Sequence, residues 1–171
     1  MADTNQNITF KGEPTPVGGS VVKVGDAAPE VTLTANDLSD LSLDSFKGNV
    51  VIVSSVPSLD TPVCQVQTKR FNEEVTKLSD EVKVLTVSSD LPFAQKRWCG
   101  AEGVENVVTA SDYKYRTFRD AYGVSWEGPA LLARAVFVVD KEGKVAHVEY
   151  ADDITAEPNY EAVVSKVQEL V

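Results

Sequence analysis

The first of the two cysteines in this sequence stands where a helix is expected to begin. In Thr61-Pro62-Val63-Cys64 the threonine suits the N-cap, and the proline suits the first helical position, where a missing N–H costs little. Cys64 then falls in the first turn, whose unpaired backbone N–H groups carry partial positive charge. That charge favours a thiolate over a thiol, so Cys64 is a candidate nucleophile; the alternative is a small residue buried in the core.

The second cysteine, Cys99, does not form a dithiol exchange motif with the first. Such a motif needs a cysteine three positions after Cys64, and Gln67 stands there. Two cysteines and one histidine are too few for the usual structural zinc site, and neither a metal nor another cofactor is expected. His147 allows a cysteine–histidine pair with Cys64. It alternates with Val145 and Glu149 in an expected strand that pairs with residues 135–139, however, and this favours a solvent-facing position.

The hydrophobic pattern predicts the elements that position these residues. The β-branched run over 49–56 indicates a strand buried on both faces, and the segment 57–60 breaks it. The helix that follows has an apolar stripe through Val63, Val66 and Phe71. Further along, the sequence predicts strands over 82–87, 107–109, 135–139 and 144–150, and helices over 92–98 (ended by Gly100), 113–121 and 160–170.

The order of these elements predicts an α/β fold. Alternating strands and helices favour parallel pairing, and the late hairpin adds antiparallel strands. Residues 8–10 and 21–24 flank a turn-rich stretch over 12–19, which suggests an N-terminal hairpin. We therefore expect a thioredoxin-like mixed sheet flanked by helices, with an N-terminal β-hairpin, in a single domain of residues 1–171.

Charge and composition exclude several classes of partner. The formal net charge of −10 repels phosphate backbones and anionic lipids, so neither nucleic acid nor a membrane is an expected partner. No run approaches the roughly 18 apolar residues of a membrane span. The polar start over residues 1–10 lacks a basic stretch followed by an apolar one. We therefore expect no secretory signal and a cytoplasmic location.

Four segments resemble a known family. Pro57-Ser58-Leu59-Asp60-Thr61-Pro62-Val63-Cys64 resembles the Pro-x-x-x-Thr-x-x-Cys motif of the peroxiredoxin active site. The segments 89–95, 99–103 and 154–160 are similar to the thiol peroxidase subgroup of that family. The resemblance extends from about Val21 to the C-terminus, and its motifs in this order are highly specific. Val56 and Trp98 depart from the phenylalanines expected at both positions.

The resemblance implies an activity and a set of partners. It implies a thioredoxin-like peroxidase that reduces hydrogen peroxide and organic hydroperoxides. It implies the atypical two-cysteine type, in which Cys64 is oxidised to a sulfenic acid and Cys99 of the same chain resolves it as a disulfide. Thioredoxin as the reductant and a homodimer are also implied.

The resemblance further assigns roles to three neighbours of the sulfur. Thr61 donates its hydroxyl to the peroxide, Arg134 places a guanidinium beside the thiolate, and Pro57 shields the sulfur from water. Without the resemblance, these residues are interpreted as a plain N-cap, a surface arginine at a strand end and a strand terminator. Cys99 is in the same way interpreted as a buried, inert thiol.

Two other functions remain open on the sequence. One is a cysteine hydrolase that uses Cys64 and His147, and the other is a redox sensor whose disulfide changes partner binding. A disulfide needs Cα atoms within about 7 Å, and the cysteines lie on separate predicted helices. We therefore expect the thiols to lie beyond bonding distance in the reduced form, and the segment 92–103 to rearrange when the disulfide forms.

Overall fold

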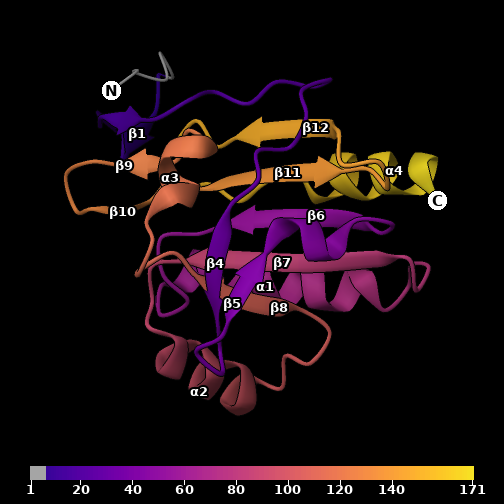
Figure 1. Cartoon of the computed structure of the whole chain (residues 1–171). Coiled ribbons are helices and arrows are strands. Elements are labelled where there is room, and N and C mark those ends of the chain that lie inside the picture. Colours follow the sequence, from indigo (N-terminus) through magenta and orange to yellow (C-terminus); the bar gives the residue numbers. More distant parts are fainter. Residues whose placement is uncertain (1–6) are drawn as a thin grey trace.

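A seven-stranded mixed sheet lies at the centre of the protein (Figure 1). The computed structural model describes residues 7–171, so the first part of the polar start lies outside the described residues. The strand order is β12-β11-β6-β7-β8-β4-β5, in which β6–β7 and β7–β8 are parallel and the other neighbours antiparallel. The predicted mixed sheet flanked by helices is confirmed. The strands of this sheet are β4 (Thr32–Ala35), β5 (Asp40–Ser42), β6 (Val50–Ser55), β7 (Val82–Ser88), β8 (Val108–Ser111), β11 (Ala135–Val139) and β12 (Val145–Tyr150).

Helices cover both faces of the sheet. Alternate residues of β6 enter different clusters: Val51 and Val53 join one, and Val50 and Ile52 join the other. The second cluster also holds Cys64 and the apolar side chains of the three longer helices, whereas α3 packs into the first. Burial of β6 on both faces confirms the interpretation of its β-branched run. The helices are η1 (Leu43–Phe46), α1 (Pro62–Val75), α2 (Pro92–Glu102), α3 (Thr117–Ala121) and α4 (Tyr160–Leu170).

The N-terminal hairpin is present but shorter than predicted. Its strands are β1 (Thr9–Phe10) and β2 (Glu13–Pro14), and residues 21–24 form no strand. The chain reverses early because Lys11 and Gly12 adopt positive φ angles of 52° and 85°. The predicted second strand over 21–24 was therefore wrong. A separate small sheet follows, made of β3 (Val17–Gly18), β9 (Ser125–Trp126) and β10 (Leu131–Leu132).

The N-terminal segment then runs beside the outer strand β12 (Figure 1). Near one end of β12, the amide of Gly25 donates to the carbonyl of Val145 at 2.9 Å, and the amide of Val145 donates to Asp26. Past the other end, the amide of Ile154 donates to the carbonyl of Thr9 at 2.9 Å. The N-terminal segment is thus fixed against the C-terminal part of the sheet.

Helix boundaries agree with the sequence except at two places. Helix α2 continues through Gly100 and ends at Gly103, whose φ of 67° provides the left-handed C-cap. The prediction that Gly100 ends this helix was wrong because a glycine inside a helix is tolerated when no turn requires it. Helix α3 begins later than predicted, since Arg116 before it has a φ of 60°. Helix α4 has the predicted bounds.

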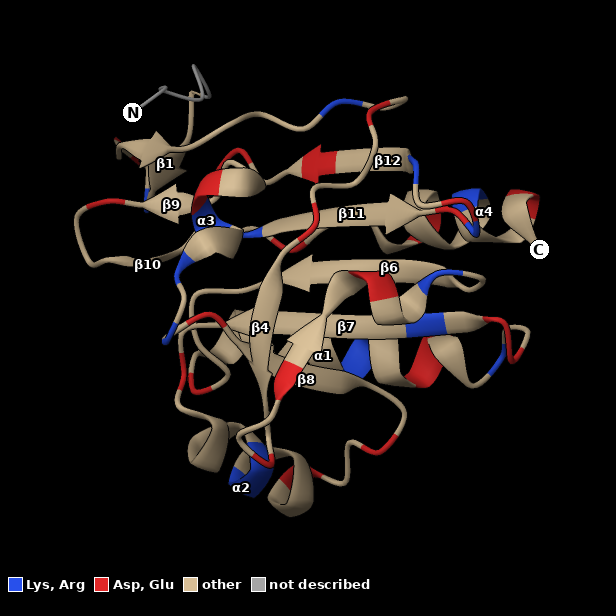
Figure 2. Cartoon of the chain, in the orientation of Figure 1, with Lys and Arg blue, Asp and Glu red and all other residues tan. Residues whose placement is uncertain are grey.

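Acidic residues are spread over the helices and loops of the view rather than gathered on one element (Figure 2). This agrees with the net charge of −10 for the sequence. Within residues 7–171, the structure contains no helix long and apolar enough to cross a membrane.

Candidate active site

Cys64 lies in the first turn of α1, where the sequence placed it, and its side chain is fully buried. A guanidinium N–H of Arg134 donates to its sulfur, with 3.3 Å between Nη2 and Sγ. Arg134 directly precedes β11, the antiparallel neighbour of β6. It therefore stands at the end of the sheet where β6 ends and the loop to α1 begins.

Arg134 is held from three sides. Its Nε donates to the carbonyl of Ile154 and its Nη1 to Oε1 of Gln67, both at 2.8 Å, while Nη2 faces the sulfur. Gln67 in turn donates its amide to the hydroxyl of Ser54 on β6 at 2.7 Å. Arg134 is only 2% exposed, so its interpretation as a surface arginine was wrong. Every nitrogen of the fork has one partner, which fixes its plane.

Positively charged and positively polarised groups surround Cys64. The buried guanidinium of Arg134 lies within hydrogen-bond distance of the sulfur, and the N-terminal turn of α1 adds its partial positive charge. The same guanidinium is placed to stabilise charge that moves onto an oxygen bonded to the sulfur. The arrangement is therefore suited to nucleophilic attack by sulfur on an electron-poor atom.

Thr61 and Pro57 lie on the loop between β6 and α1. Thr61 is the N-cap residue, but its hydroxyl makes no capping bond and donates instead to the carbonyl of Ser58 at 3.0 Å. Pro57 is buried and follows Val56, which packs in the same apolar cluster as Cys64. The loop thus contributes Val56 to the apolar cluster around Cys64, and the hydroxyl of Thr61 is bonded within the loop.

Cys99 lies on α2 and is half-buried, and both cysteines are free thiols. Its sulfur is 3.6 Å from the hydroxyl of Thr109, which donates to Oδ1 of Asn36 at 3.2 Å. Burial raises the pKa of the Cys99 thiol, and the hydrogen bond with Thr109 offsets part of that rise. Burial therefore favours the neutral thiol at Cys99.

His147 does not contact the sulfur of Cys64 through any hydrogen bond or ion pair of the described residues. It lies on β12 opposite Val138, and its Nε2 is 3.9 Å from a carboxylate oxygen of Glu149. Its side chain is 19% exposed, so the expected solvent-facing position is wrong. The polar partner of the Cys64 sulfur is the guanidinium of Arg134, which does not favour a cysteine–histidine pair.

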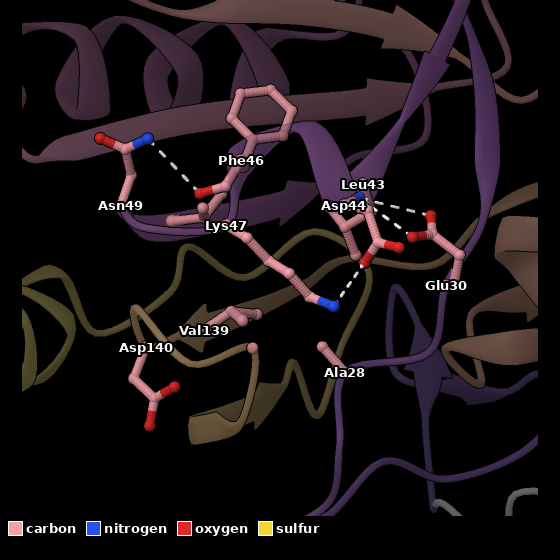
Figure 3. Close-up of a pocket in the computed structure, with 11 residues that line it drawn as sticks. Ala28, Glu30, Leu43, Asp44, Phe46, Lys47, Asn49, Val139 and Asp140 are labelled. Carbon is pink, nitrogen blue, oxygen red and sulfur yellow. Dashed lines mark hydrogen bonds and ion pairs between the residues drawn. The ribbon is translucent and has the colours of Figure 1, made fainter.

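A small pocket lies at the other end of β6 (Figure 3). Asn49 and Val51 contribute to it, and its polar side chains pair with one another, as in the 3.2 Å ion pair of Lys47 with Asp44. None of the predicted site residues lines it. This pocket is therefore separate from the cysteine site.

The groups that hold Arg134 in place were not predicted from the sequence. Gln67 and Ser54 are polar residues with fully buried side chains, and the third partner is a backbone carbonyl, which carries no side-chain signal. The signal for Gln67 was its spacing: residues 64, 67, 68 and 71 of α1 are the buried ones, and they share one helical face with Cys64.

The protein has a thioredoxin-like fold, with a buried cysteine beside an arginine at one end of its sheet. A family model described as Redoxin matches residues 23–164. A thiol peroxidase of Oceanobacillus iheyensis is 52% identical over 159 residues, covering 93% of this chain and 96% of its own. A thiol peroxidase of Bacillus subtilis is 51% identical over 164 residues, covering 96% and 98%.

Solved structures agree with these relatives. The crystal structure of a peroxiredoxin-like protein from Aquifex aeolicus matches with a TM-score of 0.89 at 48% identity, covering 96% of each chain. The chain belongs to the Redoxin family and, within it, to the thiol peroxidases of the peroxiredoxin type. It is a peroxidase, as the resemblance implied.

Replacing Arg134 by alanine is expected to slow the reaction of Cys64 with peroxide by about a hundredfold, the usual cost of one preorganised donor at a reacting centre. The Arg134→Lys variant keeps the charge but not the three-way fork, and we expect it to recover only part of the rate. Stopped-flow mixing with hydrogen peroxide measures both. An exposed arginine such as Arg97 serves as the control, and an Arg134→Ala rate equal to that of Arg97→Ala contradicts the role.

Proposed function

We propose that this peroxidase reduces hydrogen peroxide and organic hydroperoxides through a Cys64 sulfenic acid and an intramolecular Cys64–Cys99 disulfide that thioredoxin reduces. The observation that carries the proposal is the 3.3 Å contact between the Arg134 guanidinium and the sulfur of Cys64. It supports Cys64 rather than Cys99 as the attacking sulfur, since burial raises the pKa of Cys99.

In the first step the Cys64 thiolate attacks one oxygen of the peroxide. The S–O bond forms as the O–O bond breaks, and the leaving oxygen takes up a proton to become water or an alcohol. Arg134 stabilises the charge that moves along the S–O–O line. Thr61 turns its hydroxyl from the Ser58 carbonyl to the peroxide, and buried Pro57 keeps water from the sulfur.

In the second step the sulfur of Cys99 attacks the sulfenic acid. The S–S bond forms, the S–O bond breaks, and the hydroxide leaves with the Cys99 proton as water. Cys99 must first leave its half-buried place beside Thr109, because its sulfur has to reach the sulfur of Cys64. We propose that residues 92–103 rearrange to release it. Two electrons and two protons from the thioredoxin dithiol then restore both thiols.

Three further features complete the proposal. The chain works as one domain over residues 1–171 and as a homodimer. The cytoplasm is its compartment, since a reducing pool there keeps two free thiols such as Cys64 and Cys99 ready for the next cycle. Thiol peroxidases of Oceanobacillus iheyensis and Bacillus subtilis, each about half identical, support the reaction class.

The test is to add one equivalent of hydrogen peroxide to the reduced chain and to map its disulfides by mass spectrometry. We expect a single Cys64–Cys99 linkage, which reduced thioredoxin converts back to two thiols with steady peroxide consumption. Disulfide formation without turnover would favour a redox sensor over the proposed cycle. A chain in which Cys64 is oxidised but Cys99 stays a thiol contradicts the resolving step.

A further inference from the structure

The carboxylate of Asp90 joins two segments that carry the two cysteines. Asp90 lies in the turn between β7 and α2, and it accepts hydrogen bonds from the loop between β6 and α1. The hydroxyl of Ser58 donates to Oδ1 at 2.7 Å, and the backbone amide of Leu59 donates to Oδ2 at 2.8 Å. This loop, residues 57–61, ends at the N-cap of the helix that holds Cys64.

On its other side the same carboxylate is connected to α2. Its Oδ2 accepts from the hydroxyl of Ser88 at 2.8 Å, and that hydroxyl accepts from the side-chain amide of Gln95 at 2.9 Å. Gln95 is fully buried on α2, one helical turn before Cys99. The bond from Ser88 to the carboxylate is charge-assisted, whereas the bond from Gln95 to Ser88 joins neutral groups, and the same amide of Gln95 also donates to the carbonyl of Ala110 at 2.9 Å.

We propose that Asp90 is a positioning residue that latches the loop 57–61 to the start of α2 and thereby sets both chemical steps of the cycle. While the latch is closed, the loop holds its peroxide-binding shape and α2 keeps Cys99 away from Cys64. Its release allows α2 to open and Cys99 to reach the sulfenic acid. This inference rests on the proposed function, since it requires Cys99 to resolve Cys64.

Removing the latch is expected to change the rates of the two steps in opposite directions. Removing the carboxylate loosens the loop, so attack on peroxide slows because Thr61 and the sulfur are less well placed. The same removal weakens the attachment of α2, so opening becomes easier and the disulfide forms faster. A residue that only stabilises the fold has no reason to slow one step and accelerate the other.

The experiment compares the wild type with Asp90→Ala, using full-length reduced chains mixed with hydrogen peroxide and quenched by thiol alkylation at short times. Mass spectrometry counts the thiol, sulfenic acid and disulfide forms of Cys64. For Asp90→Ala we expect sulfenic acid to form about tenfold more slowly and to convert to disulfide about tenfold faster. Hydrogen exchange of the reduced chain is expected to be faster over residues 92–103.

The chain offers a matched control in Asp60. Its carboxylate lies on the same loop and faces Arg97 of α2 at 3.9 Å, but both side chains are 67% exposed. Such a pair contributes little, so Asp60→Ala is expected to change each rate by less than about twofold. Ser58→Ala removes one bond of the latch and is expected to shift both rates in the same directions as Asp90→Ala, by about threefold.

The possible outcomes distinguish failure of the latch from failure of the proposed function. The latch is overturned if, in both Asp90→Ala and Ser58→Ala, the rates of sulfenic acid formation and disulfide formation match the wild type or both decrease. A Cys64–Cys99 disulfide in the wild type would leave the proposed function intact in that case. If the wild type forms no Cys64–Cys99 disulfide, the proposed function and the latch fall together. If Asp90→Ala does not fold, the opposite shifts in Ser58→Ala decide the question.

Discussion

A Cys64→Ser chain is expected to lose peroxide consumption with reduced thioredoxin by at least about a thousandfold. Serine is close to cysteine in size, so the buried site keeps its shape and Arg134 keeps a hydrogen-bond acceptor. A hydroxyl is hardly ionised at neutral pH and cannot form a sulfenic acid, so the first bond cannot be made. Following peroxide loss in a thioredoxin-coupled assay measures the effect.

The matched comparison for this variant is Cys99→Ser in a single-turnover reaction. That chain retains Cys64 and should consume one equivalent of peroxide, whereas Cys64→Ser should consume none. Circular dichroism of both variants shows whether the fold is kept. Stoichiometric peroxide consumption by a folded Cys64→Ser chain would assign the chemistry to another residue.

In steady state, the Cys99→Ser chain is expected to lose thioredoxin-coupled turnover almost completely. Without the second sulfur the sulfenic acid of Cys64 has no partner within the chain, so it persists or is oxidised further to the sulfinic acid. Mass spectrometry after excess peroxide should find Cys64 with two or three added oxygens. The rate of the first oxidation should stay within about twofold of the wild type, since Cys99 does not contact the Arg134 guanidinium in the described bonds.

A replacement of Thr109 by valine is a useful control for that variant, because it leaves both sulfurs in place and removes the hydroxyl beside Cys99. Valine is similar to threonine in shape, and the disulfide should still form. Steady turnover of Cys99→Ser at the wild-type rate would show that thioredoxin reduces the sulfenic acid directly, and Cys99 would then have no resolving role.

The central elements could be predicted because their hydrophobic patterns match their burial. The run over 50–55 is buried on both faces, and α4 begins after Asn159, whose side chain accepts from the amide of Ala162. Strands of two residues, such as β3 and β9, have no periodicity to detect, so the second small sheet could not be predicted.

The apolar stripe of α1 predicted the wrong buried face for this helix. The sequence pattern placed Val66 on the buried face, but its side chain is 49% exposed, and the polar residues Gln67 and Thr68 are buried instead. Gln67 holds Arg134, and the hydroxyl of Thr68 donates to the carbonyl of Cys64 at 2.8 Å. Hydrophobicity alone cannot find a helix face whose polar groups serve a site.

The sequence motifs identified Cys64 and Arg134 as candidates, but not the groups that hold Arg134 in place. The motif around Cys64 named the loop and the helix start, and the structure brings Arg134 to the sulfur across the sheet. The carbonyl of Ile154 and the carboxylate of Asp90 act through hydrogen bonds to distant segments. Such long-range contacts follow from the folded topology and leave no local pattern.

The N-terminal segment also covers part of one edge of the sheet. β12 is an edge strand, and an uncovered strand edge is a template on which a second molecule can add a strand and aggregate. Backbone hydrogen bonds with Gly25 and Asp26 pair both the carbonyl and the amide of Val145, and Thr9 pairs with the chain past the other end of β12. A chain shortened to begin after Asp26 is expected to leave both groups of Val145 without these partners, so this part of the edge would be open to strand addition.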